Sequence, residues 1–228
     1  MNAFRCIIHQ KAFYFIAFLA ALIPGLILTG NNSEVNCFLL LNQLHSQWLD
    51  LFFINLRFLG NGIFSIAAAA LILIVWKQRW LALNIIVAYL FSGILAQVLK
   101  RFFMAPRPKE IITGSLFRSF IDGITGVGRD GFPSGHTTPV FAFATILALY
   151  VNRKRWGLFF LVIAMIVGYS RIYLGQHFLQ DVIAGAVLDT VIGLIVYALF
   201  NFRKTIFGAR GSSEATSIEE TYSSTLAG

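Results

Sequence analysis

Long apolar runs dominate this chain and restrict what it can fold into. Six runs follow one another, and they approach the roughly 20 residues that a helix needs to cross a bilayer. They are Ala12–Leu28, Leu59–Trp76, Trp80–Leu99, Thr137–Val151, Trp156–Tyr169 and Val182–Phe200. The fourth and fifth runs are short and must borrow residues from their flanks. We therefore predict an all-α polytopic membrane helix bundle with about six transmembrane helices.

The composition favours the same class of protein. Hydrophobic residues make up 57% of the 228 residues and charged residues only 12%, about half the share of a soluble domain. The net charge is +8, but the basic residues are dispersed and form no stripe interleaved with aromatic residues. This pattern excludes a nucleic-acid partner.

The distribution of Lys and Arg predicts the orientation in the membrane. If six helices alternate, most basic residues fall on the side of the two termini, which the positive-inside rule makes cytoplasmic. These residues are Arg5, Lys11, Lys77, Arg79, Arg153, Lys154, Arg155, Arg203, Lys204 and Arg210. The other face is then external, and it also carries cations: Arg57, Arg101, Lys109, Arg118 and Arg129.

Two segments lie outside the main pattern. After residue 207 Ser, Thr, Gly and Glu dominate, so we predict a membrane domain over 1–207, with its core at 59–200, and a disordered cytoplasmic tail over 208–228. Residues 35–58 are apolar but broken by polar side chains. They predict either a helix in the external interface that gathers lipid or a packed connector.

Three short polar segments interrupt the apolar sequence, each at the predicted external edge of a helix. They are Lys100 with Arg107-Pro108, then Pro133-Ser134-Gly135-His136, then Ser170-Arg171 with His177 and Asp181. Charged side chains beside a bilayer are costly and are therefore candidates for function. Each segment alone has an ordinary structural explanation, such as interfacial anchoring or helix capping. Their coincidence on one face indicates a site.

The residue types in these segments suit phosphate chemistry. A guanidinium can grip two phosphate oxygens at once, and a lysine adds a point charge. The start of the fourth helix offers open N–H groups to an anion, and Ser134 could cap that helix or donate to phosphate. His177 and Asp181 are four residues apart and share a helix face. We expect Asp181 to accept a proton from one ring nitrogen and to aim the other nitrogen as a nucleophile.

The three segments together resemble the motifs of the type 2 phosphatidic acid phosphatase superfamily, the membrane lipid phosphate phosphatases. Its first motif is lysine, six residues and Arg-Pro; its second is Pro-Ser-Gly-His; its third is Ser-Arg, five residues, His, three residues and Asp. All three are intact here, and the resemblance covers roughly 59–200.

The resemblance implies a role for each site residue. His177 attacks phosphorus, Asp181 orients His177, and His136 protonates the leaving oxygen and then activates water. The phosphate-binding groups are Lys100, Arg107, Ser134, Gly135 and Arg171. The acidic residues other than Asp181 are scattered, and hard cations need grouped oxygen ligands. We therefore expect no metal and no cofactor.

These observations predict a metal-independent lipid phosphate phosphatase that acts at the external leaflet through a phosphohistidine. Its partners are then the lipid bilayer and a lipid phosphate substrate, with no obligate protein partner evident. Candidate substrates are undecaprenyl diphosphate, phosphatidylglycerol phosphate, phosphatidic acid and lipid A phosphates, and a bacterial inner membrane is the expected location. Two alternatives stay open: a lipid phosphotransferase with the same site, and a non-catalytic transporter or scaffold of the same fold.

Overall fold

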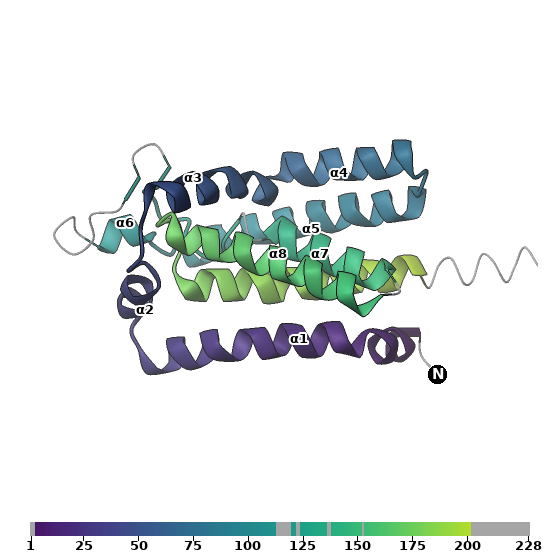
Figure 1. The fold of residues 1–228 in the computed structure, drawn as a ribbon, viewed down its shortest axis with the longest axis horizontal. Helices are drawn as coiled ribbons and strands as arrows, with labels where there is room; N and C mark the ends of the chain where they lie inside the picture. The colour runs from purple at the N-terminus through teal and green to yellow at the C-terminus, as the bar shows by residue number, and fades with distance from the viewer. Residues whose placement is uncertain (1–2, 113–119, 122–123, 136–137, 152, 202–228) are drawn as a thin grey trace, which may run out of the picture.

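The structure is a computed structural model that describes residues 3–112, 120–121, 124–135, 138–151 and 153–201. Every regular element in these ranges is a helix (Figure 1). In chain order they are α1 (Ala3–Asn31), α2 (Glu34–Leu41), α3 (Gln47–Leu56), the 3₁₀ helix η1 (Arg57–Gly60), α4 (Gly62–Val75), α5 (Arg79–Phe103), α6 (Pro108–Ile111), α7 (Thr138–Tyr150), α8 (Lys154–Tyr173) and the helix Leu179–Asn201. The predicted tail, 208–228, lies outside the described residues.

Four of these helices are long and apolar enough to cross a membrane: α1 from Lys11, α5, α8 and Leu179–Asn201. The helical segments Gln47–Gly60 and Gly62–Val75 form a fifth candidate span with a bend of 61°. The all-α membrane fold is therefore confirmed. The count of six stays a prediction, because it requires both the bent pair and the shorter apolar helix α7 to cross.

The short helix α7 lies at the centre of the bundle. Its 13 residues extend about 20 Å, less than the hydrocarbon thickness of about 30 Å. It contacts α1, α4, α5 and α8, and side chains along it, among them Phe141, Ile146 and Leu149, are almost fully buried. The last helix also approaches it closely, because a Cβ on Gly193 would lie 3.0 Å from the carbonyl oxygen of Ala142. Other helices, rather than lipid, thus surround α7.

The segment 35–58 does not form a single interfacial helix, which was one of its two predicted interpretations. Two capped helices form instead: Ser33 Oγ accepts from the N–H of Asn36 at the start of α2, and Ser46 Oγ accepts from the N–H of Leu49 at the start of α3. After η1 the chain bends into α4, where Asn61 caps the new helix. The single helix is interrupted because serine caps start a new helix in place of continuing the old one.

The inner face of this segment packs against the end of α8. Tyr173 donates a 2.6 Å hydrogen bond to Asp50 Oδ1, and the carbonyl of Ile172 accepts one of 3.0 Å from Asn42. The outer face is apolar and exposed, with Trp48 84% accessible. The alternative of a packed connector therefore describes the inner face, while the outer face keeps the apolar surface expected of an interfacial helix.

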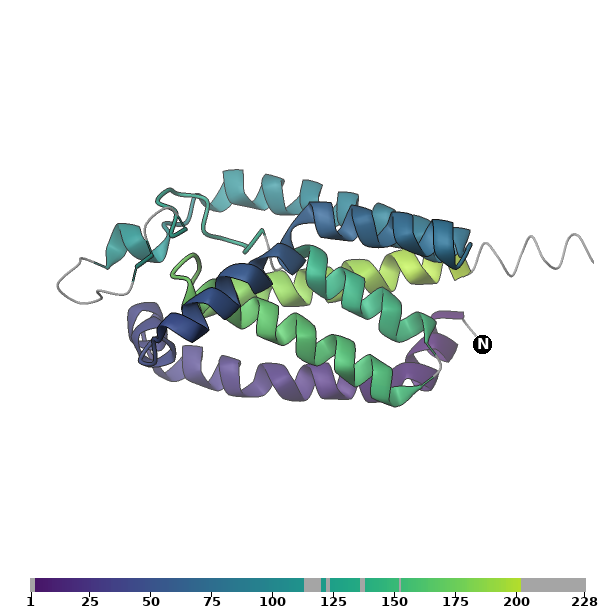
Figure 2. The same ribbon diagram turned by 45° about the horizontal axis from the view of Figure 1, so that its top comes forward.

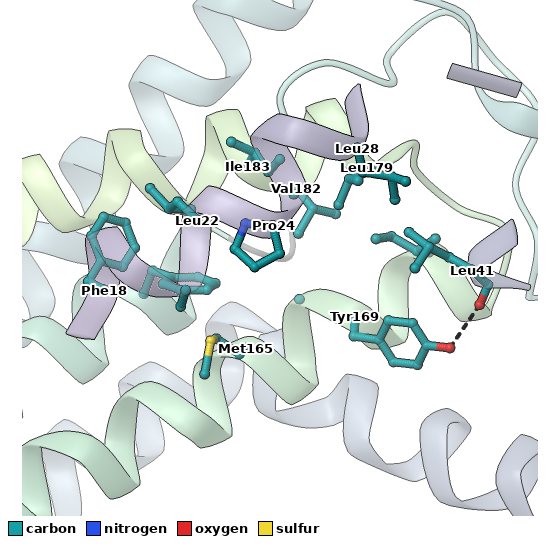
Figure 3. Close-up of a pocket in the computed structure, with 16 residues that line it drawn as sticks. Phe18, Leu22, Pro24, Leu28, Leu41, Met165, Tyr169, Leu179, Val182 and Ile183 are labelled. Atoms are coloured by element: carbon teal, nitrogen blue, oxygen red, sulfur yellow. Dashed lines mark hydrogen bonds between the residues drawn. The ribbon is translucent and has the colours of Figure 1, made fainter. Parts of the chain in front are cut away.

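An apolar cavity of about 290 Å³ separates part of α1 from α8 and the last helix. Figure 3 shows it between Phe18 and Leu22 of α1, Met165 of α8 and Val182 of the last helix. Near its far end the hydroxyl of Tyr169 donates to a backbone carbonyl of α2. Side chains of α1, α7, α8 and the last helix thus line one apolar space.

The long helices run along one axis, with α2 and α6 at one end (Figures 1 and 2). The start of α1 and the end of the last helix both lie at the opposite end. Both described ends of the chain therefore share one side of the bundle. That this side is cytoplasmic stays a prediction.

Candidate active site

The predicted site residues that the structure describes come together beside the start of α6, which Arg107 precedes. The N–H of Ser134 donates to the carbonyl of Asp181 at 3.2 Å. A Cβ on Gly135 would lie 3.0 Å from Lys100 Nζ. The loop before α7, the end of α5 and the start of the last helix therefore meet here. His136 lies outside the described residues.

The chain path around Arg107 follows from its flanking residues. The helix α5 ends in a left-handed residue, Met104, whose φ is 43°. Proline at 108 favours an extended residue before it, and Arg107 has φ −83° and ψ 160°. Its N–H donates to the carbonyl of Gly128 at 3.1 Å, and the N–H of Gly131 donates to the carbonyl of Ala105 at 2.9 Å. This pairing fixes the loop 128–131 beside the arginine.

Asp130 is a site residue that the sequence reasoning missed. Arg107 donates to both of its oxygens, at 2.8 and 2.9 Å, and Lys100 Nζ lies 3.5 Å from Oδ2. These contacts, the hydrogen bond from Arg107 first, lower the pKa of Asp130 to about 2, so the carboxylate stays charged at neutral pH. The sequence does hold a signal for Asp130. It is a carboxylate in a glycine-rich loop, on the same predicted edge as two cations.

Arg171, in the last turn of α8, is completely buried. Its Nη1 donates to Oε1 of Gln176 at 3.0 Å, and Gln176 is itself fixed by donating to the carbonyl of Ile124 at 2.9 Å. Nε and Nη2 have no hydrogen-bond partner among the described residues. Because a buried charged donor without a partner is costly, this arrangement favours binding of an anion.

His177 follows α8 in a turn and is also buried. Its Nδ1 lies 2.7 Å from the carbonyl of Gly131. A carbonyl only accepts, so Nδ1 carries the proton and Nε2 keeps its lone pair. Nε2 has no partner among the described residues. This is the tautomer that a nucleophilic histidine requires.

The electrostatic surroundings keep His177 neutral. Burial, followed by the charges of Arg107 and Lys100, lowers the pKa of His177 from 6.5 to about 3. An uncharged imidazole is the form that can attack phosphorus. The cations that suit a phosphate therefore also maintain the nucleophile.

Asp181 is placed differently from the expectation. Its Oδ2 lies 3.7 Å from His177 Nδ1 and accepts a 2.8 Å hydrogen bond from the N–H of Phe178. It thus caps the start of the last helix, while the carbonyl of Gly131 accepts the proton of the ring. A backbone acceptor of this kind has no signature in residue types.

The site as a whole suits a tetrahedral anion. Three cations, Lys100, Arg107 and Arg171, act together on His177. Ser134, at the loop before α7, is completely buried. Among the described residues no three His, Cys, Asp or Glu side chains are grouped as a metal site needs.

Comparisons with known proteins place these features in context. Residues 81–205 match the family model of the PAP2 superfamily. The lipid A 4'-phosphatase of Porphyromonas gingivalis is 30% identical over 183 residues, which cover 75% of each chain. The undecaprenyl-diphosphatase of Sulfolobus acidocaldarius is 26% identical over 193 residues, 82% of this chain and 90% of that one. The crystal structure of Aquifex aeolicus LpxE superposes with a TM-score of 0.61 at 29% identity, covering 70% of this chain and 91% of that chain.

Proposed function

Because the chain belongs to the PAP2 superfamily, we propose that it removes a phosphate group from a membrane lipid through a phosphohistidine on His177. One observation carries this mechanism. The buried, unprotonated Nε2 of His177 has no partner among the described residues, and neither do Nε and Nη2 of the buried Arg171. A phosphate bound to that guanidinium would supply the missing acceptors.

The first step transfers the phosphoryl group to the enzyme. The Nε2 lone pair attacks phosphorus in line, the bond from phosphorus to the lipid oxygen breaks, and His136 gives its proton to that oxygen. The lipid leaves with one phosphate fewer. The ring now carries a positive charge, which the carbonyl of Gly131 and the carboxylate of Asp181 stabilise.

The second step returns the enzyme to its starting state. His136, now neutral, takes a proton from water as the water oxygen attacks phosphorus. The P–N bond breaks, its electron pair returns to Nε2, and inorganic phosphate leaves. Arg171, Lys100 and Arg107 offset the charge on the phosphate oxygens in both steps, assisted by Ser134 and the N–H of Gly135.

We place this reaction at the external face of a bacterial inner membrane. The turns that carry Lys77, Arg79, Arg153 and Lys154 lie at the end of the bundle opposite the site (Figures 1 and 2). The positive-inside rule assigns basic turns to the cytoplasm. The named relatives act on lipid A and undecaprenyl diphosphate, and we propose a substrate from the same class of membrane lipid phosphates.

The test is phosphate release by the detergent-purified protein from a panel of lipid phosphates, with EDTA present. We expect release that resists chelation and is lost in His177→Ala. Equal release by the variant would rule out this nucleophile. Analysis of the lipid products separates hydrolysis from transfer to a second lipid.

A further inference from the structure

A polar pocket of about 430 Å³ lies between the end of α8 and the bend between α3 and α4. Its polar lining consists of Asn55, Arg57, Asn61, Arg171 and Gln176. η1, which carries Arg57, contacts α8. Arg171 and Gln176 line this pocket. They are hydrogen-bonded to each other, and the charge of Arg171 also acts on His177, so the pocket adjoins the site of phosphoryl transfer. We call it the headgroup pocket.

The headgroup pocket is positively charged. Two guanidinium groups, Arg57 and Arg171, line it, and none of its lining residues is acidic. In the part of the chain that the structure describes, the side chain of Arg57 forms no ion pair. Two like charges facing one cavity repel each other, and the repulsion is strong where water is partly excluded. An anion in the pocket would offset both charges.

The transferred phosphate does not account for Arg57. Arg171, Lys100 and Arg107 already supply three cations around His177. Arg57 adds a fourth from a segment outside the three motifs, together with the amides of Asn55 and Asn61. The pocket volume lies within the range of small-molecule sites, so it can hold a further polar group.

The position of the pocket suits a lipid headgroup. Phe58, which lines it, is 56% exposed, and Trp48 on the preceding helix is 84% exposed. An exposed Trp is typical of the membrane interface, and the exposed Phe58 offers apolar surface to lipid. The lipid tails of a substrate could then stay in the bilayer while its headgroup enters the pocket.

We propose that the headgroup pocket binds a second anionic group of the substrate, next to the phosphate that is transferred. The enzyme then prefers a lipid diphosphate over the monophosphate of the same chain. This inference rests on the proposed function only for the identity of the transferred phosphate. A sugar headgroup would satisfy the amides but leave Arg57 without a counter-ion.

A binding experiment tests the pocket without turnover. In a His177→Ala background, inorganic pyrophosphate and inorganic phosphate are titrated by calorimetry. We expect pyrophosphate to bind about tenfold more tightly, the scale of one charged hydrogen bond. Adding Arg57→Gln should abolish that preference, and Arg57→Lys should keep most of it.

A second variant guards against misfolding of the first. Asn61 caps α4 by accepting from the N–H of Ile63, and aspartate is an equally good cap. Asn61→Asp therefore preserves the helix start while placing a negative charge in the pocket, and it should also abolish the preference. The matched control is Arg101→Gln, which removes an exposed cation outside the pocket and should change nothing.

Turnover of two lipids with the same prenyl chain completes the test. Arg57→Gln should raise KM about tenfold for the diphosphate and leave the monophosphate within twofold. Equal loss for both lipids, or no change for either, would overturn the second-anion site. If the wild-type protein released phosphate from neither lipid yet preferred pyrophosphate, the proposed function would fail and the pocket would stand.

Discussion

Arg107 grips Asp130 side-on, through Nε at 2.8 Å and Nη2 at 2.9 Å, while Lys100 lies 3.5 Å from the same carboxylate. One negative group thus orients two of the three cations that surround His177. Nη1 of Arg107 takes no part in this bidentate pair. Asp130 is therefore a positioning residue, and the phosphate-binding geometry depends on its charge.

Asp130→Asn should lower kcat/KM about ten- to hundredfold, because an amide offers one acceptor oxygen where Arg107 needs two. The loss should appear mainly in KM and in weaker inhibition by vanadate, while thermal stability stays close to wild type. Glu110→Gln is the control, since that exposed carboxylate lies on the same side. Unchanged kinetics in Asp130→Asn would remove Asp130 from the site.

Gly126→Ala should impair the enzyme without unfolding it. A Cβ at this position would lie 2.7 Å from Nη1 of Arg107, and the flexible end of that side chain can move away. Displacement of a binding group by about 1 Å can cost roughly a hundredfold in rate. Steady-state kinetics and a melting curve measure the two effects. Gly93→Ala, where no atom lies within 4 Å, should leave the activity within about twofold, well short of that loss.

Arg171→Lys should lose about two to three orders of magnitude in kcat. A lysine cannot reproduce the planar fork that holds Gln176 with one nitrogen and offers two more to an anion. Phosphate release from a lipid substrate measures this loss. Full activity in this variant would show that the transferred phosphate binds elsewhere.

The protein should lose stability in mild acid relative to a His177→Gln variant. Its pKa is lowered from 6.5 to about 3 in the folded protein, so the unfolded chain binds the extra proton first as the pH falls below 6.5. The contribution of His177 to the stability of the folded state therefore falls by up to about 1.4 kcal/mol per pH unit over that window. Melting curves of wild type and His177→Gln between pH 7 and pH 4 measure the difference. Parallel curves would contradict the burial of a neutral imidazole.

A reporter fused after residue 228 should read as cytoplasmic, and one inserted between α2 and α3 should read as external. This expectation follows from the basic turns and from the six predicted crossings. An alkaline phosphatase and a fluorescent protein serve as a pair of reporters, because one is active only outside the cytoplasm and the other only inside it. The reversed result would place the active site in the cytoplasm.

Much of the fold could be predicted from the sequence, because membrane helices appear in it as long apolar runs. The predicted runs near Trp80–Leu99 and Trp156–Tyr169 correspond to α5 and α8, which begin one or two residues earlier and end four residues later. The extensions carry polar residues such as Lys100 and Arg171, which a hydropathy pattern counts as boundaries. The bend between α3 and α4 was not predicted, because it depends on where Asn61 starts a new helix.

Site residues could be predicted from the sequence where the residue type itself carries the chemistry. They could not be predicted where their role depends on three-dimensional geometry. Arg171 and His177 stand out in an apolar sequence, and the structure brings them together with the other cations. The carbonyl of Gly131 as acceptor for His177 left no signal, because every residue has such a group. Gln176 and Arg57 are polar residues that the sequence shows, but it does not show that they lie beside Arg171. That position follows from packing at the end of α8.

The pairs Arg107–Asp130 and Arg171–Gln176 each join residues that are close in the sequence, which bears on how the chain enters the membrane during synthesis. Asp130 lies 23 residues after Arg107, and Gln176 lies five after Arg171. Each partner therefore emerges from the ribosome soon after the cation that it holds. Asp130 can pair with Lys100 and Arg107 before α8 has been made, and Arg171 brings its own hydrogen-bond acceptor when it follows. The sequence spacing thus lets each of these contacts form locally, before the rest of the site is assembled.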